Sequence, residues 1–388
     1  MDPAAVTTDS LLAEIHSESL QSFLTSLRLD SPPTCKTAIP AVDNHAVSTN
    51  PLANGLRRGD IIELQGPPAS GKSHLVYHLV INCILPPRHT HPNFTGWGRA
   101  AVVFDPDRTF DVTRLRQLLW TRISAQGQPE QASRPTEQYL QELLDQCMRR
   151  LHVIRPTSTV QLAFSILHLS KHHATHPSLQ NEALGLIAVD SMNAFYWDDR
   201  YTMEQLRGAG APLNQNSTFV PPLAHVCKAL HRLRLSHAPV VVLTTRDLIP
   251  VPTSKVPVSE GTPVIPSSRQ HLYPFLIPAV KPRQDPEPTD VIMGDASVSN
   301  VEEDKKPPLL PNHPPRRQEA RLPLAFHLTL SQALRSDLAT DNSEALGSKG
   351  PGTSVVIRGP TGFTVGSCTL RIGEDDVLIS STLARGEV

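Results

Sequence analysis

Short apolar runs alternate with amphipathic segments along the middle of the chain. Runs of aliphatic residues between polar ones are typical of strands buried on both faces of a sheet, whereas apolar residues at helical spacing indicate helices. The predicted strands are 60–65, 99–104, 151–154, 184–189 and 240–244. The predicted helices are 74–85, 111–123, 137–150, 159–170 and 223–235. This alternation predicts right-handed βαβ crossovers and an α/β fold with a mainly parallel sheet.

The pattern changes toward both ends of the chain. Residues 9–29 carry apolar side chains at near-helical spacing, which predicts an amphipathic helix or helix pair, and the Ser-Pro-Pro stretch and small residues of 30–54 favour a linker. From about 250 to 323, prolines and charge clusters replace the pattern, which predicts a disordered insertion. Three strand candidates follow, at 324–330, 354–358 and 363–372. The hairpin-like spacing of the last two predicts an antiparallel extension of the sheet.

These changes divide the chain into four predicted segments. A chain of 388 residues can bury one large core or two modest ones. The segments are an N-terminal helical arm and linker (1–54), an α/β core (55–249), a proline-rich insertion (250–323) and C-terminal strands that complete the core (324–388).

A phosphate-binding motif follows the first strand of the predicted core. The sequence GPPASGKS is a complete Walker A loop, in which backbone N–H groups bind the α- and β-phosphates, the lysine reaches the β- and γ-oxygens, and the serine hydroxyl holds Mg²⁺. The candidate nucleotide-binding residues are Gly66, Pro67, Pro68, Ala69, Ser70, Gly71, Lys72 and Ser73. A helix predicted directly after the loop directs its positive end at the phosphates. The motif therefore predicts binding of ATP and Mg²⁺.

Acidic residues end two of the predicted strands. Asp190 follows the apolar run LIAV, as in a Walker B strand, and is a candidate ligand of Mg²⁺ directly or through water. Asp105 and Asp107 end the strand after the P-loop helix, at the sheet edge where ligands bind in such folds. One interpretation is that these two carboxylates polarise an attacking water; the other is an Asp-Pro turn in which Asp111 caps the next helix.

Composition narrows the compartment and the partners. The formal net charge of -1 provides no global basic field, so any contact with nucleic acid must rest on local patches. No stretch approaches the roughly 18 to 20 apolar residues of a membrane span. Five well-separated cysteines without C-x-x-C spacing predict unpaired thiols in a reducing compartment. We therefore expect a soluble intracellular protein with no membrane partner.

Four sequence blocks, in order, resemble a known family. The blocks are GPPASGKS, VVFDPDRTFD, LGLIAVDSMNAFYWDDR and VVVLTTRD. Their order is similar to the RecA-type recombinase core, in particular to the eukaryotic recombinase paralogues that assist recombinational DNA repair, and AFYWDDR is the narrowest signal. The resemblance covers about 11–247 and 324–380, and places the family's two DNA-facing loops at 200–219 and in the proline-rich segment.

The resemblance implies a fold, a setting and partners. The expected fold is a RecA-like P-loop ATPase core. The expected role is that of an ATP-binding subunit in homologous recombination repair of DNA double-strand breaks, located in the nucleus and assembled with other recombinase paralogue subunits. Contact with DNA is left open, either directly or through the complex.

Two positions depart from the pattern of active recombinases. Those proteins carry a catalytic Glu where this chain has Asp107, and a γ-phosphate-sensing Gln where it has Arg246. Asp is one methylene shorter, and a misplacement of about 1 Å costs on the order of 10²-fold in rate. Arg can contact phosphate but cannot copy the donor and acceptor pair of an amide. The resemblance therefore implies weak or absent hydrolysis, with Asp107 as the candidate catalytic acid and Arg246 as a candidate nucleotide contact.

Two rival functions stay open at this stage. An active DNA-dependent ATPase or strand-exchange protein requires DNA-stimulated turnover, which the two departures disfavour. A P-loop small-molecule kinase requires an arginine-rich lid over the phosphates, and the proline-rich segment has only scattered basic residues.

Two further features have both a functional and a structural interpretation. The aromatic residues Phe195, Tyr196 and Trp197 can stack on single-stranded bases, but the two acids that follow repel phosphate, so core packing is favoured. His172 and His176 have the i, i+4 spacing of a metal site. With no third ligand near them in the sequence, a solvated helix end is favoured.

Overall fold

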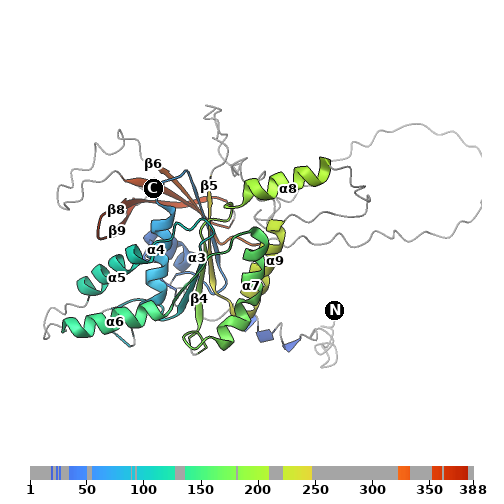
Figure 1. The fold of residues 1–388 in the computed structure, drawn as a ribbon. Helices are drawn as coiled ribbons and strands as arrows, with labels where there is room; N and C mark the ends of the chain where they lie inside the picture. Colours follow the sequence, from blue (N-terminus) through green and yellow to red (C-terminus); the bar gives the residue numbers. More distant parts are fainter. Residues whose placement is uncertain are drawn as a thin grey trace, which may run out of the picture.

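The computed structural model describes residues 35–49, 55–88, 90–91, 94–126, 136–180, 182–208, 222–246, 322–332, 352–360 and 362–382, together with a few residues between 19 and 27. Its strands form one nine-stranded sheet in the order β3-β2-β4-β5-β1-β6-β7-β8-β9 (Figure 1). The strands are β1 (Ile61–Gly66), β2 (Ala100–Phe104), β3 (Leu151–Ile154), β4 (Leu184–Val189), β5 (Val240–Arg246), β6 (Phe326–Gln332), β7 (Thr353–Arg358), β8 (Thr364–Ile372) and β9 (Val377–Thr382).

Along this order, the strands β3, β2, β4, β5, β1 and β6 pair in parallel with their neighbours. The strands β6, β7, β8 and β9 pair antiparallel. The fold is therefore α/β with a mainly parallel sheet and an antiparallel extension, which confirms the fold class predicted from the sequence. The helices are α3 (Pro40–Thr49), α4 (Lys72–Ile84), α5 (Val112–Gln126), α6 (Glu137–Arg149), α7 (Thr159–Thr175), α8 (Tyr196–Gly208) and α9 (Pro222–His237).

Helices cover both faces of the parallel part of the sheet. Figure 1 shows α4, α5 and α6 on one face and α7 and α9 on the other. Two hydrophobic clusters form the core. Because strand side chains alternate between faces, Ile62 and Leu64 of β1 pack into one cluster and Ile61 packs into the other. All six residues of β1 are buried. This burial on both faces explains why the central strands are continuous apolar runs.

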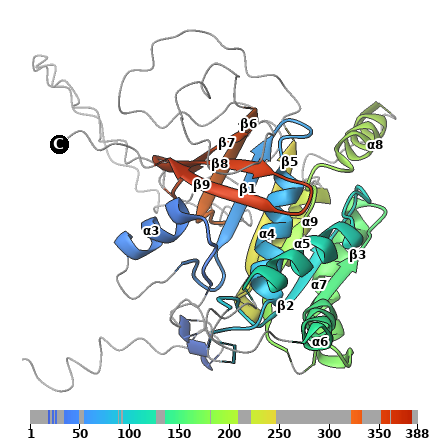
Figure 2. The same ribbon diagram turned by 90° about the vertical axis from the view of Figure 1, so that its left-hand side faces the viewer.

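The expectation of a linker through 30–54 is wrong for its second half, because residues 40–49 form α3. Thr37 and Ala38 donate backbone hydrogen bonds to the carboxylate of Asp43, at 2.9 and 3.0 Å. Ile39 and Val42 are fully buried against the core. Figure 2 shows α3 beside β8 and β9. The helix has few large apolar residues, so its own sequence gives a weak signal, and tertiary packing with this turn specifies it.

Two other boundaries differ from the expectation. Residues 196–208 form α8, so positions 200–208 of the loop that the resemblance placed at 200–219 are helical, and positions 209–219 lie outside the described residues. β9 is an additional strand paired with β8. The predicted insertion at 250–323 lies outside the described residues except for its last two positions, and Leu322 is fully buried there. Within the described part of the chain, no helix is both long and apolar enough to cross a membrane.

Candidate nucleotide-binding site

A cavity of about 440 Å³ lies at the carboxyl ends of β1, β2, β4 and β5. These four strands are neighbours in the parallel part of the sheet, so the loops that leave them meet at one edge. The cavity is lined by Pro68, Ala69, Ser70, Gly71, Lys72, Ser73, His74, Asp107, Thr109, Asp190, Ser191, Arg246 and Ile372. The structure therefore brings most of the residues of the Walker A loop together with Asp107, Asp190 and Arg246.

The Walker A loop has a conformation that its sequence permits. Gly71 has a φ of 91°, a left-handed value that favours glycine. A Cβ atom at this position would also lie only 2.9 Å from the side chains of Leu370 and Ile372 in β8. The antiparallel extension thus packs directly against the phosphate-binding loop.

The loop presents backbone N–H groups and a cation. No side chain caps the N-terminus of α4, and its first turn has no acid, so the backbone N–H groups there suit an anion. Lys72 is buried, and its Nζ donates to the carbonyls of Gly66 and Pro67, both at 2.7 Å. A bound phosphate can replace these neutral acceptors with a charged one.

Asp190 joins the P-loop helix to the sheet. The hydroxyl of Ser73 donates to Oδ2 of Asp190 at 2.7 Å, and the hydroxyl of Thr244 donates to Oδ1 at 2.5 Å. Asp190 is buried, with 5% of its surface exposed. A serine hydroxyl and a carboxylate at hydrogen-bond distance are hard oxygen donors of the kind Mg²⁺ prefers. The residues present therefore fit Mg²⁺ and a nucleoside triphosphate.

Asp107 and Arg246 form an ion pair across the cavity. The same carboxylate oxygen of Asp107 accepts a hydrogen bond from the hydroxyl of Ser191 at 2.9 Å. The backbone N–H of Arg246 donates to the side-chain carbonyl of Asn193 at 3.3 Å, which fixes the end of β5. Asp107 is thus oriented toward the site, but its charge is already neutralised by a partner.

The two carboxylates after β2 have different roles. Asp105 is fully buried, accepts from the backbone of Thr109 at 2.9 Å and pairs with Arg155 at 3.2 Å. It does not line the cavity, so the expectation that both acids face an attacking water is wrong for Asp105. Asp111 accepts from the backbone N–H of Thr113 at 2.8 Å and caps α5, as the alternative interpretation predicted.

Several residues of the site were not anticipated. Thr244 and Ser191 hold the two acids, and Ile372 closes the cavity from a strand far along the chain. Ser191 directly follows the Walker B acid, so its position alone was a usable signal. Nothing in the local sequence of Ile372 indicates that it lies beside the P-loop, because β8 reaches it only through the sheet order.

The expectation that the aromatic residues after Walker B pack in the core is wrong for Trp197. Its exposed fraction is 62%, and that of Tyr201 one turn later is 64%. Arg200 lies over the Trp197 ring at 5.6 Å. These residues lie on α8, which projects from the body of the protein (Figure 1).

The expectation of no third ligand beside His172 and His176 is also wrong. His152 of β3 lies next to them, and one ligand atom from each of the three histidines falls within 4.8 Å of the others.

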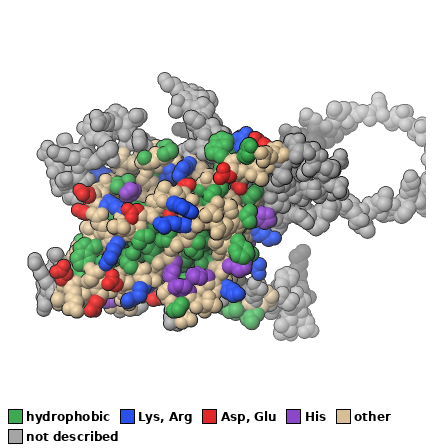
Figure 3. Space-filling model, viewed as in Figure 1, with side chains coloured by type: hydrophobic (Ala, Val, Ile, Leu, Met, Phe, Trp, Pro, Cys, Tyr) green, Lys and Arg blue, Asp and Glu red, His purple; other side chains and the backbone are tan. Residues whose placement is uncertain are grey.

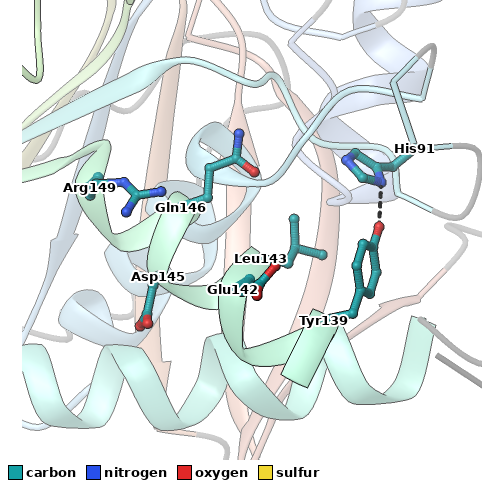
Figure 4. Close-up of a pocket in the computed structure, with 7 residues that line it drawn as sticks. All are labelled: His91, Tyr139, Glu142, Leu143, Asp145, Gln146 and Arg149. Carbon is teal, nitrogen blue, oxygen red and sulfur yellow. Dashed lines mark hydrogen bonds between the residues drawn. The ribbon is translucent and has the colours of Figure 1, made fainter. Parts of the chain in front are cut away.

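A second cavity, of about 420 Å³, lies along α6 and contains the hydrogen bond of 3.1 Å between Tyr139 and His91 (Figure 4). Its lining comes mainly from one helix, so it has no convergent set of catalytic groups.

The fold and the site together fit a RecA-like α/β core with a P-loop. A parallel sheet with helices on both faces, a P-loop after a central strand and an acid at the end of β4 make up such a core. No protein-family model matches the chain.

The chain is similar in sequence to proteins of DNA repair and recombination. The chain is 31% identical to DNA repair protein XRCC2 of Mus musculus over 192 residues, and 27% identical to the DNA repair protein XRCC2 homolog of Arabidopsis thaliana over 212 residues. It is 25% identical to DNA repair and recombination protein RadA of Methanocorpusculum labreanum over 181 residues. These similarities confirm the resemblance to RecA-type recombinase paralogues.

The matches cover part of each protein. The aligned region is 49% of this chain for the mouse protein and 50% for the Arabidopsis protein. The chain spans a little over half the length of these relatives, 57% and 56%.

Proposed function

We propose that this protein is an ATP- and Mg²⁺-binding subunit of a recombinase-paralogue complex that acts in the nucleus in homologous recombination repair of DNA double-strand breaks. The observation that carries the proposal is the Ser73–Asp190 hydrogen bond beneath a complete Walker A loop, in a chain similar to two proteins named DNA repair protein XRCC2. The nuclear location and the repair role rest on these relatives, while ATP binding rests on the site.

The nucleotide is held by the loop and by the two strand ends. Backbone N–H groups of the P-loop and the start of α4 bind the phosphates, and Lys72 exchanges its contacts with Gly66 and Pro67 for phosphate oxygens. Ser73 and Asp190 hold Mg²⁺, which neutralises phosphate charge. Arg246 is a further phosphate contact, since its guanidinium lines the same cavity.

Weak hydrolysis follows from the state of Asp107. A general base must be free to accept a proton from water, and the Arg246 guanidinium and the Ser191 hydroxyl both bind the same Asp107 oxygen. The shorter Asp side chain adds to this cost. We therefore assign the protein a structural, nucleotide-binding role in its complex.

A docking element supports the partner assignment. Leu20, Phe23, Leu24 and Leu27 lie in helical backbone near the N-terminus, with exposed fractions of 71%, 50%, 40% and 50%. Apolar side chains at this spacing form one face, and such a face suits a groove on another subunit. We propose that it binds another recombinase paralogue. Contact with DNA, either direct or through the complex, is part of the same proposal.

Co-expression with recombinase paralogues from the same organism tests the proposal. Size-exclusion chromatography should give a stable one-to-one complex with one of them, and Leu20→Glu with Leu24→Glu should break it without loss of ATP binding. Val47→Glu is the matched control, because Val47 is an apolar residue 43% exposed on α3. A monodisperse monomer that binds none of these paralogues would refute the assignment.

A further inference from the structure

Three histidines form a cluster at the end of the sheet opposite the nucleotide site. His152 is the second residue of β3, His172 lies in the last turn of α7, and His176 is the C-terminal cap residue of that helix. The P-loop site lies at the carboxyl ends of the parallel strands, whereas His152 lies near the amino end of its strand. Figure 3 shows histidine side chains gathered on this part of the surface. The cluster is thus separate from the nucleotide site.

The three imidazole rings lie side by side. Their centroids are 6.4 Å apart for His152 and His172, 5.2 Å for His152 and His176, and 4.9 Å for His172 and His176. One ligand nitrogen from each lies within 4.8 Å of the other two, and this is the one such set of histidine, cysteine or acidic residues found in the described part of the chain.

The geometry points to a metal site, and we propose that His152, His172 and His176 bind one divalent transition-metal ion, with Zn²⁺ as the ion of choice. Zn–N bonds of about 2.0 to 2.1 Å in a tetrahedral site place ligand nitrogens roughly 3.3 Å apart. His172 is exposed, so rotation of its side chain can close the remaining gap. An all-imidazole donor set favours Zn²⁺, Cu²⁺ or Ni²⁺ over Mg²⁺ and Ca²⁺, which prefer oxygen.

The surroundings of the cluster support this assignment. Ser178 hydrogen-bonds to Nδ1 of His176 at 2.9 Å and lies 3.2 Å from Nε2 of His152, so one hydroxyl orients two of the rings.

A metal at this position would join the edge strand of the sheet to the C-terminal end of α7. β3 is the edge strand of the sheet and pairs only with β2 among the described strands. Three histidines leave one coordination position for water or for a donor from another molecule. The ion therefore acts as a clamp between the sheet edge and the end of α7, and its binding is independent of nucleotide.

Titration of the full chain with Zn²⁺, with saturating Mg²⁺ and ATP present, tests the site. Competition with a chromophoric chelator should show one equivalent bound with a Kd in the micromolar range or tighter, and Co²⁺ should give the visible absorption of a four-coordinate ion. His172→Ala with His176→Ala should weaken Zn²⁺ binding by at least 100-fold. His168→Ala is the control, because His168 is exposed on the same helix and lies outside the cluster.

A second measurement guards against misfolded variants. Zn²⁺ should raise the Tm of the wild type and of His168→Ala by several degrees, and should leave the Tm of His172→Ala unchanged. His172 is an exposed helix-end residue, so this single variant should keep the wild-type circular dichroism spectrum. Equal Zn²⁺ affinity in the wild type and the double variant would overturn the proposal, as would the absence of saturable binding to the wild type.

Discussion

Arg246 pairs with Asp107 across the candidate nucleotide site, so the residue at the position that the resemblance assigns to γ-phosphate sensing neutralises the residue at the position that it assigns to catalysis. The two side chains come from the ends of β5 and the loop after β2, which are separated by 139 residues in the sequence. Both departures from the pattern of active recombinases are thus parts of one interaction. This pairing leads to the first prediction.

Hydrolysis should be slow in the wild type and should recover only when both positions are changed. Asp107→Glu lengthens the carboxylate side chain, but the carboxylate still pairs with the Arg246 guanidinium. Arg246→Gln removes this partner, but the Asp107 side chain is still one methylene too short. The double variant should hydrolyse ATP about 10²-fold faster than the wild type, the factor expected for correcting a displacement of about 1 Å. Phosphate release under single-turnover conditions, with and without single-stranded DNA, measures this. Wild-type turnover near 1 s⁻¹ or faster, within the usual enzyme range, would contradict it.

Lys72→Ala should weaken ATP binding by about 10- to 100-fold, because a hydrogen bond to a charged group contributes about 1.5 to 3 kcal/mol. Fluorescent ATP in the presence of Mg²⁺ provides the measurement. Lys228→Ala removes an exposed lysine on α9 and should bind like the wild type. An ATP affinity of Lys72→Ala equal to that of the wild type would contradict the assignment of the P-loop to the nucleotide site.

Acid should destabilise the protein partly through His78. Burial, with a contribution from Arg122, lowers the pKa of His78 from 6.5 to about 4, and its Nε2 lies 2.8 Å from the Thr37 carbonyl oxygen. Below pH 6.5 the His78 side chain binds a proton in the unfolded chain but stays neutral in the folded chain. The free energy of unfolding therefore decreases as the pH falls from 6.5 toward 4. The loss from this group is at most about 3 kcal/mol at 1.36 kcal/mol per pH unit.

Urea unfolding at pH 7.5 and pH 5.0 tests the contribution of this histidine. His78→Gln keeps a donor for the Thr37 carbonyl but does not titrate, so the difference in unfolding free energy between the two pH values should shrink. His168→Gln, at an exposed position, should leave the difference unchanged. An unaltered difference in His78→Gln would show that another group causes the acid sensitivity.

Trp197→Ala should cost at most about 1 kcal/mol in unfolding free energy, because the side chain is 62% exposed and its main partners are Arg200 and Tyr196. Phe104→Ala removes a fully buried ring of β2 and should cost about 3 to 5 kcal/mol. Chemical denaturation of both variants gives the comparison. A cost for Trp197→Ala similar to that for Phe104→Ala would mean that α8 packs against the core.

Most of the fold could be predicted from the sequence because its central strands are buried on both faces. Their apolar runs stand out from amphipathic helices, and the Walker A loop marks the first crossover. The helix α3 escaped prediction because its stability comes from the Asp43 contacts with Thr37 and Ala38 and from packing of Ile39 and Val42, which local periodicity does not report.

The sequence likewise predicts only part of the candidate site. A contiguous motif such as GPPASGKS carries its chemistry in local spacing, and an acid after an apolar strand is visible once the alternation of strands and helices is known. The pairing of Asp107 with Arg246 and the position of Asp105 away from the cavity were not visible, because side-chain direction after a strand depends on the turn that follows.

The sequence by itself determined the α/β class, the Walker A motif and the resemblance to recombinase paralogues, since each is encoded in short-range pattern. Only the tertiary structure decided which residues meet. It placed Ile372 beside the P-loop and His152 beside His172 and His176, because these contacts depend on the sheet order and on crossovers that bring distant segments together. Long-range proximity of this kind has no local signature in the chain.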